Sequence, residues 1–584
     1  MIGKVVEIDN ETINIILDDG INQGNLINQY LIINSGNKLL VGEVVNIKGK
    51  TINAKLIGEI INNEFVFGVI NRPNVDSKVY LMAKDKIPLV VSVTQFDDAK
   101  DFYLGMNPVH DIPIGVNINK FFSQHYSILG STGSGKSCGV ARIFQNLFYK
   151  EKPPLDMHLC IFDAYGEYNR AFSGLSSLNP SLQFKAYSTN LENQDSLIRL
   201  PAWLLSVDDL ALLLEAEKPS QLLIIEKALS LVKLFKSNSE LVESFKNDII
   251  ARAILDVLLS GRPASQIRDQ VFSVLSVYRT QELNLDTLIY QPGYTRNLKQ
   301  CLLIDKTGKI AEMELLIAFF NQFVLEDTRR DNIDDVVTYN LMDLDDAFNF
   351  ALVSEGVLKS DHIYDEYNTL RVRIHALANG DYHHYFEFDH YVDRNTYIKE
   401  LLMPNGVNTQ IVNFNINYVD DRFAKNLVKI YSKMFFDYEK ELKDRGSFPI
   451  HLLLEEAHRY VQNDNDVNVL GYNIFDRITK EGRKYGIILG LISQRPSELS
   501  ETSISQCSNF IIFKTTHYKD TEYIRKMIPN ITEDIVKQLK ILQPGNCLAF
   551  GSAFKVPVLV RLDMPDPAPS SDSVDVSSEW FGNV

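Results

Sequence analysis

The spacing of hydrophobic residues shows where the chain changes character. Over residues 1–95, apolar and polar residues alternate in short runs such as 12–17 and 41–45, and turn formers such as Asp19-Gly20 separate these runs. Alternation with a period of two is typical of half-buried strands. The pattern predicts a small β-barrel or sandwich. This module is either an assembly or partner-docking element or a plain structural cap, because it contains no residues that suggest chemistry.

Residues 96–180 have the pattern of the first part of an α/β core. A connector comes first, in which Pro108 and Pro113 interrupt any long element. Apolar runs at 125–129 and 159–162 follow. Short, continuously apolar runs are typical of the buried strands of a parallel sheet.

Residues 181–335 predict a mostly helical insertion between core strands. Residues 206–209 form a capping-box pattern, and 221–235 and 249–259 have the wide apolar faces of packed helices. The first strand-like run after them is 301–304. The charged residues of this region have no spacing that implies catalysis, so a solvated surface is expected.

The core resumes over residues 336–565. A long amphipathic helix is expected near 423–441. Apolar strands are expected on both sides of it, at 410–415, 451–454, 487–492, 510–513 and 547–550. Alternating strands and helices predict an α/β fold with a parallel sheet.

The end of the chain, residues 566–584, is expected to be a flexible tail. It is rich in Pro, Ser and Asp, a composition that cannot bury enough apolar surface to fold alone. It ends in the aromatic pair Trp580-Phe581, which could dock on a neighbouring subunit or a partner.

Composition narrows the class of protein. A chain of 584 residues has room for two to four domains, and 45% hydrophobic with 23% charged residues is ordinary for a soluble globular protein. No apolar run reaches the roughly 18 residues of a membrane span, and the N-terminus has no signal-peptide layout. Five cysteines without paired C-x-x-C spacing argue for the cytoplasm and against a zinc site. A net charge of −16 disfavours a protein that coats nucleic acid without sequence specificity. It leaves room for a ring-shaped motor, which needs positive charge only along its channel.

The candidate chemistry starts at residues 130–137, Gly-Ser-Thr-Gly-Ser-Gly-Lys-Ser, which match the phosphate-loop pattern G-x-x-x-x-G-K-[ST]. Gly133 and Gly135 let the backbone close around an anion, and Lys136 places its charge on the β- and γ-phosphates. The Ser137 hydroxyl can hold Mg²⁺. The residues predicted to bind ATP are therefore Gly130, Ser131, Thr132, Gly133, Ser134, Gly135, Lys136, Ser137 and Cys138.

The flanks of this loop argue against a chance Gly/Ser turn. Residues 125–129 are strand-like, and 138–149 can form a helix with Ile143 and Leu147 on one face. The order of strand, loop and helix would place phosphates at a helix N-terminus.

Two stretches could supply the acidic Walker B strand. Residues 336–343 end in Asp343, but polar Thr338 and Asn340 interrupt their apolar pattern, whereas a central parallel strand should be almost continuously apolar. Residues 451–456 are the better candidate, since an unbroken apolar run leads into two carboxylates. Glu455 would then help to hold the Mg²⁺ shell, and Glu456 would orient or deprotonate the attacking water.

Further polar residues follow predicted strand ends. Gln494 comes at the tip of the strand 487–492, where it can sense the γ-phosphate, and Arg483 and Arg495 can offer charge to the transition state. The stretch 163–168 places Asp163 and Glu167 just past a strand end, where open α/β sheets bind ligands. A solvated turn explains that stretch equally well.

Taken together, four features of the chain resemble the HerA family of hexameric ATPases. They are the strand that leads into the phosphate loop, Asp163…Gly166-Glu167-Tyr168, Glu455-Glu456-Ala457-His458, and Glu481-Gly482-Arg483-Lys484-Tyr485-Gly486 with Ser493-Gln494-Arg495-Pro496. This family belongs to the same broad superfamily as the DNA pump FtsK. The resemblance covers most of the chain, and the N-terminal region resembles the HAS-barrel of the family. It implies a RecA-like core that binds ATP and Mg²⁺ between the subunits of a homohexamer.

The resemblance also implies roles and partners. Lys136 and Ser137 would bind phosphate and Mg²⁺, and Glu456 would be the catalytic carboxylate. Arg483 would be the arginine finger that is offered to the next subunit. Gln494 would be the sensor at the tip of its strand. Such rings move double-stranded DNA and work with a partner nuclease of the NurA type. Relatives in bacterial antiviral operons pair instead with other nucleases or with sirtuin-type NAD hydrolases.

A second function stays open from the sequence: a nucleotide-switched ring that assembles and activates an effector with little DNA transport. The strand-tip Gln494 and the N-terminal barrel disfavour a protein-remodelling AAA+ ATPase. The absence of an L-S-G-G-Q signature disfavours an ABC-type ATPase.

Overall fold

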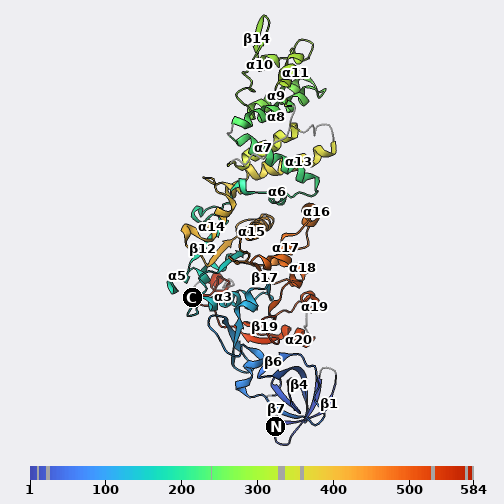
Figure 1. The fold of residues 1–584 in the computed structure, drawn as a ribbon, viewed down its shortest axis with the longest axis vertical. Coiled ribbons are helices and arrows are strands. Elements are labelled where there is room, and N and C mark those ends of the chain that lie inside the picture. Colours follow the sequence, from blue (N-terminus) through green and yellow to red (C-terminus); the bar gives the residue numbers. More distant parts are fainter. Residues whose placement is uncertain are drawn as a thin grey trace. The chain divides into compact units, whose positions relative to one another are not determined.

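The computed structural model describes residues 1–9, 12–21, 26–237, 240–325, 336–354, 361–527, 533–571 and 576–581. Contacts within it define two compact units. The sheet unit comprises Met1–Asn190, Ile398–Asn463 and Ile474–Val584, and the helical unit comprises Leu191–Tyr397 and Asp464–Asn473. Figure 1 labels the elements of both.

The sheet unit begins with a closed β-barrel. Its strands follow the order β2-β1-β7-β3-β4-β5, and β2 also pairs with β5, so six strands close the ring while β6 extends β5. Alternate side chains point inward and form a separate core around Val5, Ile15 and Val44, as the period of two requires. The barrel expected from the sequence is confirmed. Its strands are β1 (Gly3–Ile8), β2 (Thr12–Leu17), β3 (Tyr30–Ser35), β4 (Lys38–Lys48), β5 (Thr51–Ile61), β6 (Glu64–Phe67) and β7 (Lys78–Leu81).

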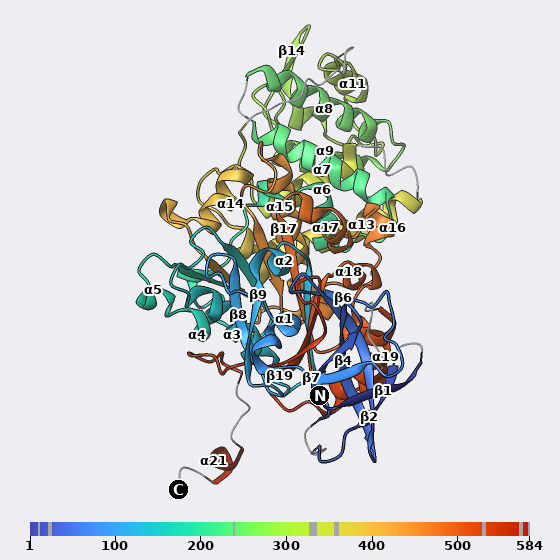
Figure 2. The same ribbon diagram turned by 60° about the horizontal axis from the view of Figure 1, so that its bottom comes forward.

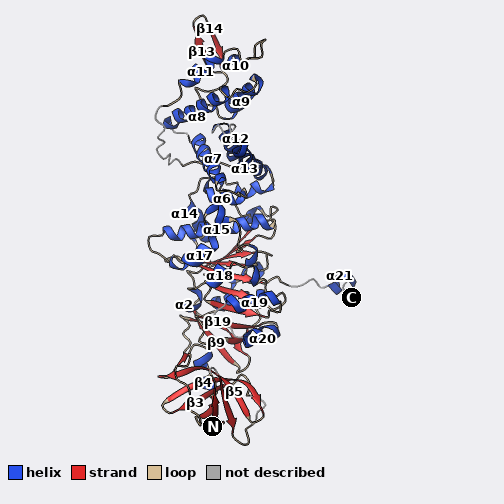
Figure 3. Ribbon diagram, turned by 90° about the vertical axis from the view of Figure 1, so that its right-hand side faces the viewer, coloured by secondary structure: helices blue, strands red, loops and turns tan. Residues whose placement is uncertain are grey.

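An eleven-stranded sheet forms the rest of the core, in the order β12-β15-β11-β16-β17-β10-β18-β19-β20-β8-β9. The strands from β12 to β18 are parallel, and those beyond β18 are antiparallel. This confirms the α/β fold class, and Figure 3 shows the strands of this sheet in red. The strands are β8 (Asp101–Asn107), β9 (Ile112–Asn117), β10 (Tyr126–Leu129), β11 (His158–Asp163), β12 (Phe184–Ser188), β15 (Ile411–Asn415), β16 (Ile450–Leu454), β17 (Ile487–Ser493), β18 (Asn509–Phe513), β19 (Asn546–Gly551) and β20 (Val558–Arg561).

One prediction for this region is wrong. The stretch with Pro108 and Pro113 was expected to be a connector, but β8 and β9 form a hairpin there. Pro113 is tolerated because β9 is the edge strand of the sheet, where a residue without an N–H leaves no ladder bond unmade.

The helices of the sheet unit are mostly short. The longest of those described is α15. The side chain of Asp420 caps its first turn, because it accepts hydrogen bonds from the backbone N–H groups of Arg422 and Phe423. The bounds are α1 (Pro88–Val91), α2 (Ile118–Phe122), α3 (Lys136–Phe148), α4 (Asn169–Phe172), α5 (Leu175–Leu178), α15 (Asp421–Glu441), α17 (Ile474–Glu481), α18 (Glu501–Ser505), α19 (Tyr518–Met527), α20 (Glu533–Ile541) and α21 (Val576–Phe581).

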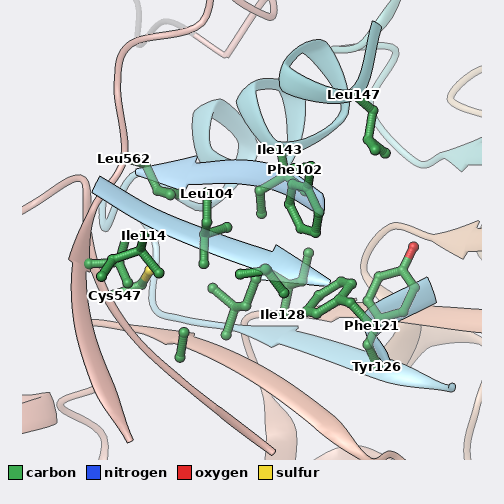
Figure 4. Packing of buried hydrophobic residues seen from close by; sticks show 14 of the residues in the cluster. Phe102, Leu104, Ile114, Phe121, Tyr126, Ile128, Ile143, Leu147, Cys547 and Leu562 are labelled. Atoms are coloured by element: carbon green, nitrogen blue, oxygen red, sulfur yellow. The ribbon is translucent and has the colours of Figure 1, made fainter. Parts of the chain in front are cut away.

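The α3 helix packs its apolar face on the sheet. Ile143 and Leu147, expected on one face, are 1% and 2% exposed. Figure 4 shows them beside Phe102 of β8 and above Ile128 of β10. This packing fixes the N-terminus of α3 relative to the strand that precedes it.

The helical unit is built from helices that pack on one another, with α12 against α7, α8 and α13. Figure 2 labels α7, α8 and α13. It continues to Tyr397, past the boundary of 335 taken from the sequence, and includes the short helix α16. Its elements are α6 (Val207–Leu213), α7 (Ser220–Lys236), α8 (Glu240–Leu258), α9 (Ala264–Val277), α10 (Leu298–Cys301), α11 (Met313–Asn321), α12 (Leu341–Ser354), α13 (Asp361–Asn379), α16 (Asp466–Leu470), the hairpin β13 (Leu288–Gln291) and β14 (Tyr294–Asn297), and α14 (Arg394–Leu402), which runs on into the sheet unit.

Two stretches of the helical unit differ from the sequence-based prediction. Residues 301–304 form no strand, since Cys301 ends α10 and only an isolated bridge joins Ile304 to Ile310. The rejected Walker B candidate is not a strand either, because Asp343 lies in the first turn of α12. The side chain of Asn340 accepts the Asp343 N–H at 2.9 Å, which makes it a helix cap.

A buried acid on α15 allows a prediction about stability. Glu439 is fully buried, and neither carboxyl oxygen has a hydrogen-bond partner among the described residues. Burial raises its pKa to about 8. The folded chain therefore holds a proton that the unfolded chain releases above its ordinary pKa near 4.5. The free energy of unfolding should fall as pH rises through this window, by about 1.4 kcal/mol per pH unit at most.

We expect Glu439→Gln to remove this dependence. Relative to the unmodified chain, the variant should gain stability between pH 5 and pH 8, measured as the free energy of unfolding in urea. Glu151→Gln is the matched control, because Glu151 is exposed. An identical pH slope in the Glu439→Gln variant and the unmodified chain would contradict the assignment.

Candidate nucleotide site

The phosphate loop joins β10 to α3 in the order expected from the sequence. Gly133 and Gly135 have φ values of +72° and +91°, which favour glycine. Gly135 also packs closely, since a Cβ there would lie 2.8 Å from the backbone N of Gly545. The loop is tied to neighbouring strands by hydrogen bonds from the Gly130 N–H to the Ser493 carbonyl (3.2 Å) and from the Ser131 N–H to the Lys514 carbonyl (2.9 Å). The result is an anion cradle at the N-terminus of α3 that fits a nucleotide phosphate.

Lys136 and Glu456 form a buried pair at this cradle. The Lys136 Nζ lies 3.7 Å from the Glu456 Oε1, and their side chains are 5% and 2% exposed. A buried charge needs a partner. In this arrangement, therefore, Glu456 neutralises the lysine that the loop pattern assigns to phosphate.

Glu456 sits directly past the end of β16 in a left-handed conformation, with φ +47°. Such a backbone is uncommon for a residue with a side chain and is enriched at functional sites. Burial alone would raise its pKa, but His458, Lys136 and Gln494 outweigh burial and hold the pKa below its ordinary value. Glu456 is therefore an ionised carboxylate, the form that can orient or deprotonate water.

Gln494 connects the loop to this carboxylate. Its Nε2 donates to the Glu456 Oε1, and its Oε1 accepts from the Thr132 hydroxyl. β17, which carries Gln494, lies between β16 and β10 in the sheet. A side chain at the tip of this strand therefore contacts the ends of both neighbouring segments.

His458 is a residue that the sequence analysis did not assign to the site. Its Nδ1 lies 3.2 Å from the Glu456 Oε2 and 3.2 Å from the Ser493 Oγ. It belongs to the stretch Glu455-Glu456-Ala457-His458 that carries the HerA resemblance, but the sequence analysis gave it no role.

Glu455 has a different environment from its neighbour. It is buried, its Oε2 accepts from the Ala164 N–H at 3.1 Å, and burial and the nearby Asp163 raise its pKa well above the ordinary value. Asp163 in turn accepts N–H groups from Gly166 (2.8 Å), Glu167 (3.0 Å) and Tyr168 (2.9 Å). Glu455 is thus held as a neutral acid against Asp163. This arrangement does not favour it as a direct Mg²⁺ ligand.

Glu167 lies closer to the predicted metal position. Its carboxyl group hydrogen-bonds the Ser137 side chain, and burial raises its pKa. The Glu167 Oε2 is buried without a hydrogen-bond partner among the described residues. The hydroxyl of Ser137 and the carboxyl of Glu167 are oxygen donors of the kind that Mg²⁺ takes, so these two residues fit the metal.

The structure places Arg483 apart from this group. It lies in the turn Gly482–Lys484, before the start of β17, whereas Gln494 follows the end of that strand. Seven strand residues span about 20 Å, so Arg483 cannot reach its own phosphate loop. Its side chain is exposed. The structure thus brings together residues 130–138, Glu455, Glu456 and Gln494, and leaves Arg483 at the opposite edge of the sheet.

Comparison with known proteins finds relatives that are named as helicases. The family described as "Helicase HerA, central domain" matches residues 102–320, which include the phosphate loop. Over these residues the chain is similar to the HerA helicase family. A curated relative from Saccharolobus solfataricus, named "DNA double-strand break repair helicase HerA", is 29% identical over 202 residues, 33% of this chain and 40% of the relative. A probable helicase of Methanocaldococcus jannaschii is 25% identical over 543 residues, 90% of this chain and 81% of the relative.

The alignments with the first curated relatives cover 32–40% of their length. Among solved structures, VirB4 of Thermoanaerobacter pseudethanolicus resembles 80% of the HerA-like chain at 13% identity, with 97% of VirB4 covered and a TM-score of 0.40. None of the described helices is both long and apolar enough to cross a membrane.

Proposed function

We propose that this HerA-like chain hydrolyses ATP with Mg²⁺ and uses the reaction to move double-stranded DNA through a ring of six copies. The observation that carries the ATPase part is the linkage from Thr132 through Gln494 to Glu456, with Lys136 beside it. It joins a phosphate cradle to an ionised carboxylate, and these are the two parts that phosphoryl transfer to water requires.

Each residue has a role in this proposal. Gly133, Gly135 and the N-terminus of α3 hold the phosphates, and Lys136 neutralises them. Ser137 and Glu167 hold Mg²⁺, which offsets the phosphate charge when bound. Glu456 orients the attacking water and accepts its proton. Gln494 senses the γ-phosphate. Because Lys136 contacts Glu456 in this structure, engaging phosphate would release the carboxylate for its role.

The hexamer is supported by the position of Arg483. An exposed arginine about 20 Å from its own site can act as a finger only on a neighbouring copy. DNA as the substrate is supported by the names of the curated relatives, which describe DNA repair helicases. A separate effector, such as a NurA-like nuclease or a sirtuin-type NAD hydrolase, would then act with the ring in antiphage defence.

The deciding experiment is ATP hydrolysis by the purified chain with and without linear double-stranded DNA, together with its mass in solution. We expect a particle of six copies whose hydrolysis DNA stimulates several-fold. Lys136→Ala, which should lose nucleotide affinity, is the background control. A ring that hydrolyses ATP at the same rate with and without DNA would contradict the translocase and favour a nucleotide-switched effector scaffold.

A further inference from the structure

A cluster of possible metal ligands lies in the helical unit, away from the nucleotide site. The 3-10 helix Asp381–Phe386 follows α13 and carries His383 and His384, and Glu387 comes directly after it. One ligand atom from each of the three side chains lies within 4.8 Å of the others. The side chains are 33%, 43% and 55% exposed, so an ion can reach them from solvent.

The two histidine–carboxylate separations in this cluster match those around a tetrahedral ion. The His383 Nε2 lies 3.4 Å from the Glu387 Oε1, and the His384 Nδ1 lies 3.2 Å from the Glu387 Oε2. Zinc binds nitrogen and carboxylate oxygen at about 2.0–2.2 Å, so two ligand atoms on a tetrahedron around it are about 3.3–3.5 Å apart. The carboxylate therefore needs little movement to share an ion with either imidazole.

The orientation of His383 supports an ion over a simple hydrogen bond. The His383 Nδ1 lies 2.7 Å from the Gly380 carbonyl oxygen, which can only accept, so this nitrogen carries the proton. In a neutral ring the Nε2 then presents a lone pair to the Glu387 carboxylate. Two acceptors 3.4 Å apart repel unless a cation lies between them. A backbone carbonyl that fixes the tautomer in this way is the usual outer partner of a metal-binding histidine.

The two imidazole rings also lie close together, with their centroids 3.9 Å apart. Each contact with Glu387 by itself accounts for one imidazole. A single divalent ion would account for both imidazoles and the carboxylate together.

We propose that His383, His384 and Glu387 bind a divalent transition-metal ion of the zinc class. Three protein ligands leave a fourth tetrahedral position open to water or another ligand. Nitrogen and carboxylate donors suit zinc better than magnesium, which prefers oxygen alone. The ion would stabilise the turn after α13. It would be distinct from the Mg²⁺ of the nucleotide site. The expectation against a zinc site considered only cysteine spacing, and none of the five cysteines belongs to this cluster.

The test uses the full chain after treatment with a chelator and dialysis. Zn²⁺ is titrated in the presence of excess Mg²⁺ by calorimetry, and Co²⁺ is added in parallel because a tetrahedral Co²⁺ site has strong visible absorption. We expect one Zn²⁺ per chain and a tetrahedral Co²⁺ spectrum. His383→Ala and Glu387→Gln should each weaken Zn²⁺ binding about tenfold or more, and His384→Ala should abolish the tetrahedral spectrum.

His390→Ala is the matched control, since His390 belongs to the same histidine-rich stretch but lies outside the cluster. It should bind Zn²⁺ as the unmodified chain does. Glu387→Gln keeps the shape of the side chain, and circular dichroism of each variant checks that it folds. Absence of stoichiometric Zn²⁺ binding by the unmodified chain, or equal affinity in Glu387→Gln, would overturn the proposal and leave an imidazolium–carboxylate pair.

Discussion

Glu456→Gln should abolish steady-state ATP hydrolysis while ATP binding persists. Glutamine keeps the size of the side chain and can still hydrogen-bond Gln494, but it cannot accept a proton or carry the charge that orients water. Loss of a general base costs about 10²–10⁴-fold in rate, so kcat should fall by at least about a hundredfold. ATP affinity should stay equal or rise, because Lys136 loses the carboxylate that lies 3.7 Å away in this structure.

The measurement pairs hydrolysis with equilibrium binding of a fluorescent ATP analogue. Asp343→Asn is the control, since Asp343 ends the rejected Walker B candidate and its Oδ1 lies 2.6 Å from the Lys236 Nζ in the helical unit. That variant should hydrolyse ATP normally. The choice of strand would be wrong if Asp343→Asn, rather than Glu456→Gln, removed turnover.

Parts of the fold could be predicted from the sequence because their signals are local. The phosphate loop is a contiguous motif, and β11, β16 and β17 are mostly apolar because each is buried at every position. The start of α12 was missed although its signal is also local. Asn340 and Asp343 form a reciprocal cap of 2.9 and 3.1 Å. Asn340 was taken as an interruption of a strand and Asp343 as its acidic end, but together they mark the start of a helix.

The electrostatics of the site could not be predicted, because they depend on which strands are neighbours. β11 pairs in parallel with β16, with Phe162 opposite Leu454. This register places Asp163 beside Glu455 and explains why two adjacent glutamates differ, one as a neutral acid and the other as a carboxylate. Glu167 was left open between a ligand and a solvated turn. Its contact with Ser137 arises from the fold of the loop after β11, which no spacing in the sequence reveals.

The second large effect concerns Arg483→Ala, which should bind ATP normally but lose hydrolysis. An arginine finger contributes about 10³–10⁵-fold in kcat, so the loss should be about a thousandfold or more. Lys484→Ala is the control, because Lys484 is exposed in the same turn and also carries a positive charge. It should retain turnover. Arg483→Ala with a normal rate of hydrolysis would show that the finger is assigned to the wrong residue.

Mixing variants tests whether this arginine acts between copies. Arg483→Ala and Glu456→Gln are each expected to be inactive alone. In a mixed ring, a subunit with intact Glu456 can receive Arg483 from a Glu456→Gln neighbour, so some sites regain both groups. Co-expression of the two variants should therefore restore part of the ATPase activity, in proportion to the number of interfaces that combine them in the right order. Restoration is impossible if both groups must come from one chain, because neither variant contains an intact pair. Arg483 lies roughly 20 Å from its own phosphate loop. Activity in the mixture would thus establish that it acts on the site of a neighbouring subunit, and that it does not reach its own site by movement within one subunit.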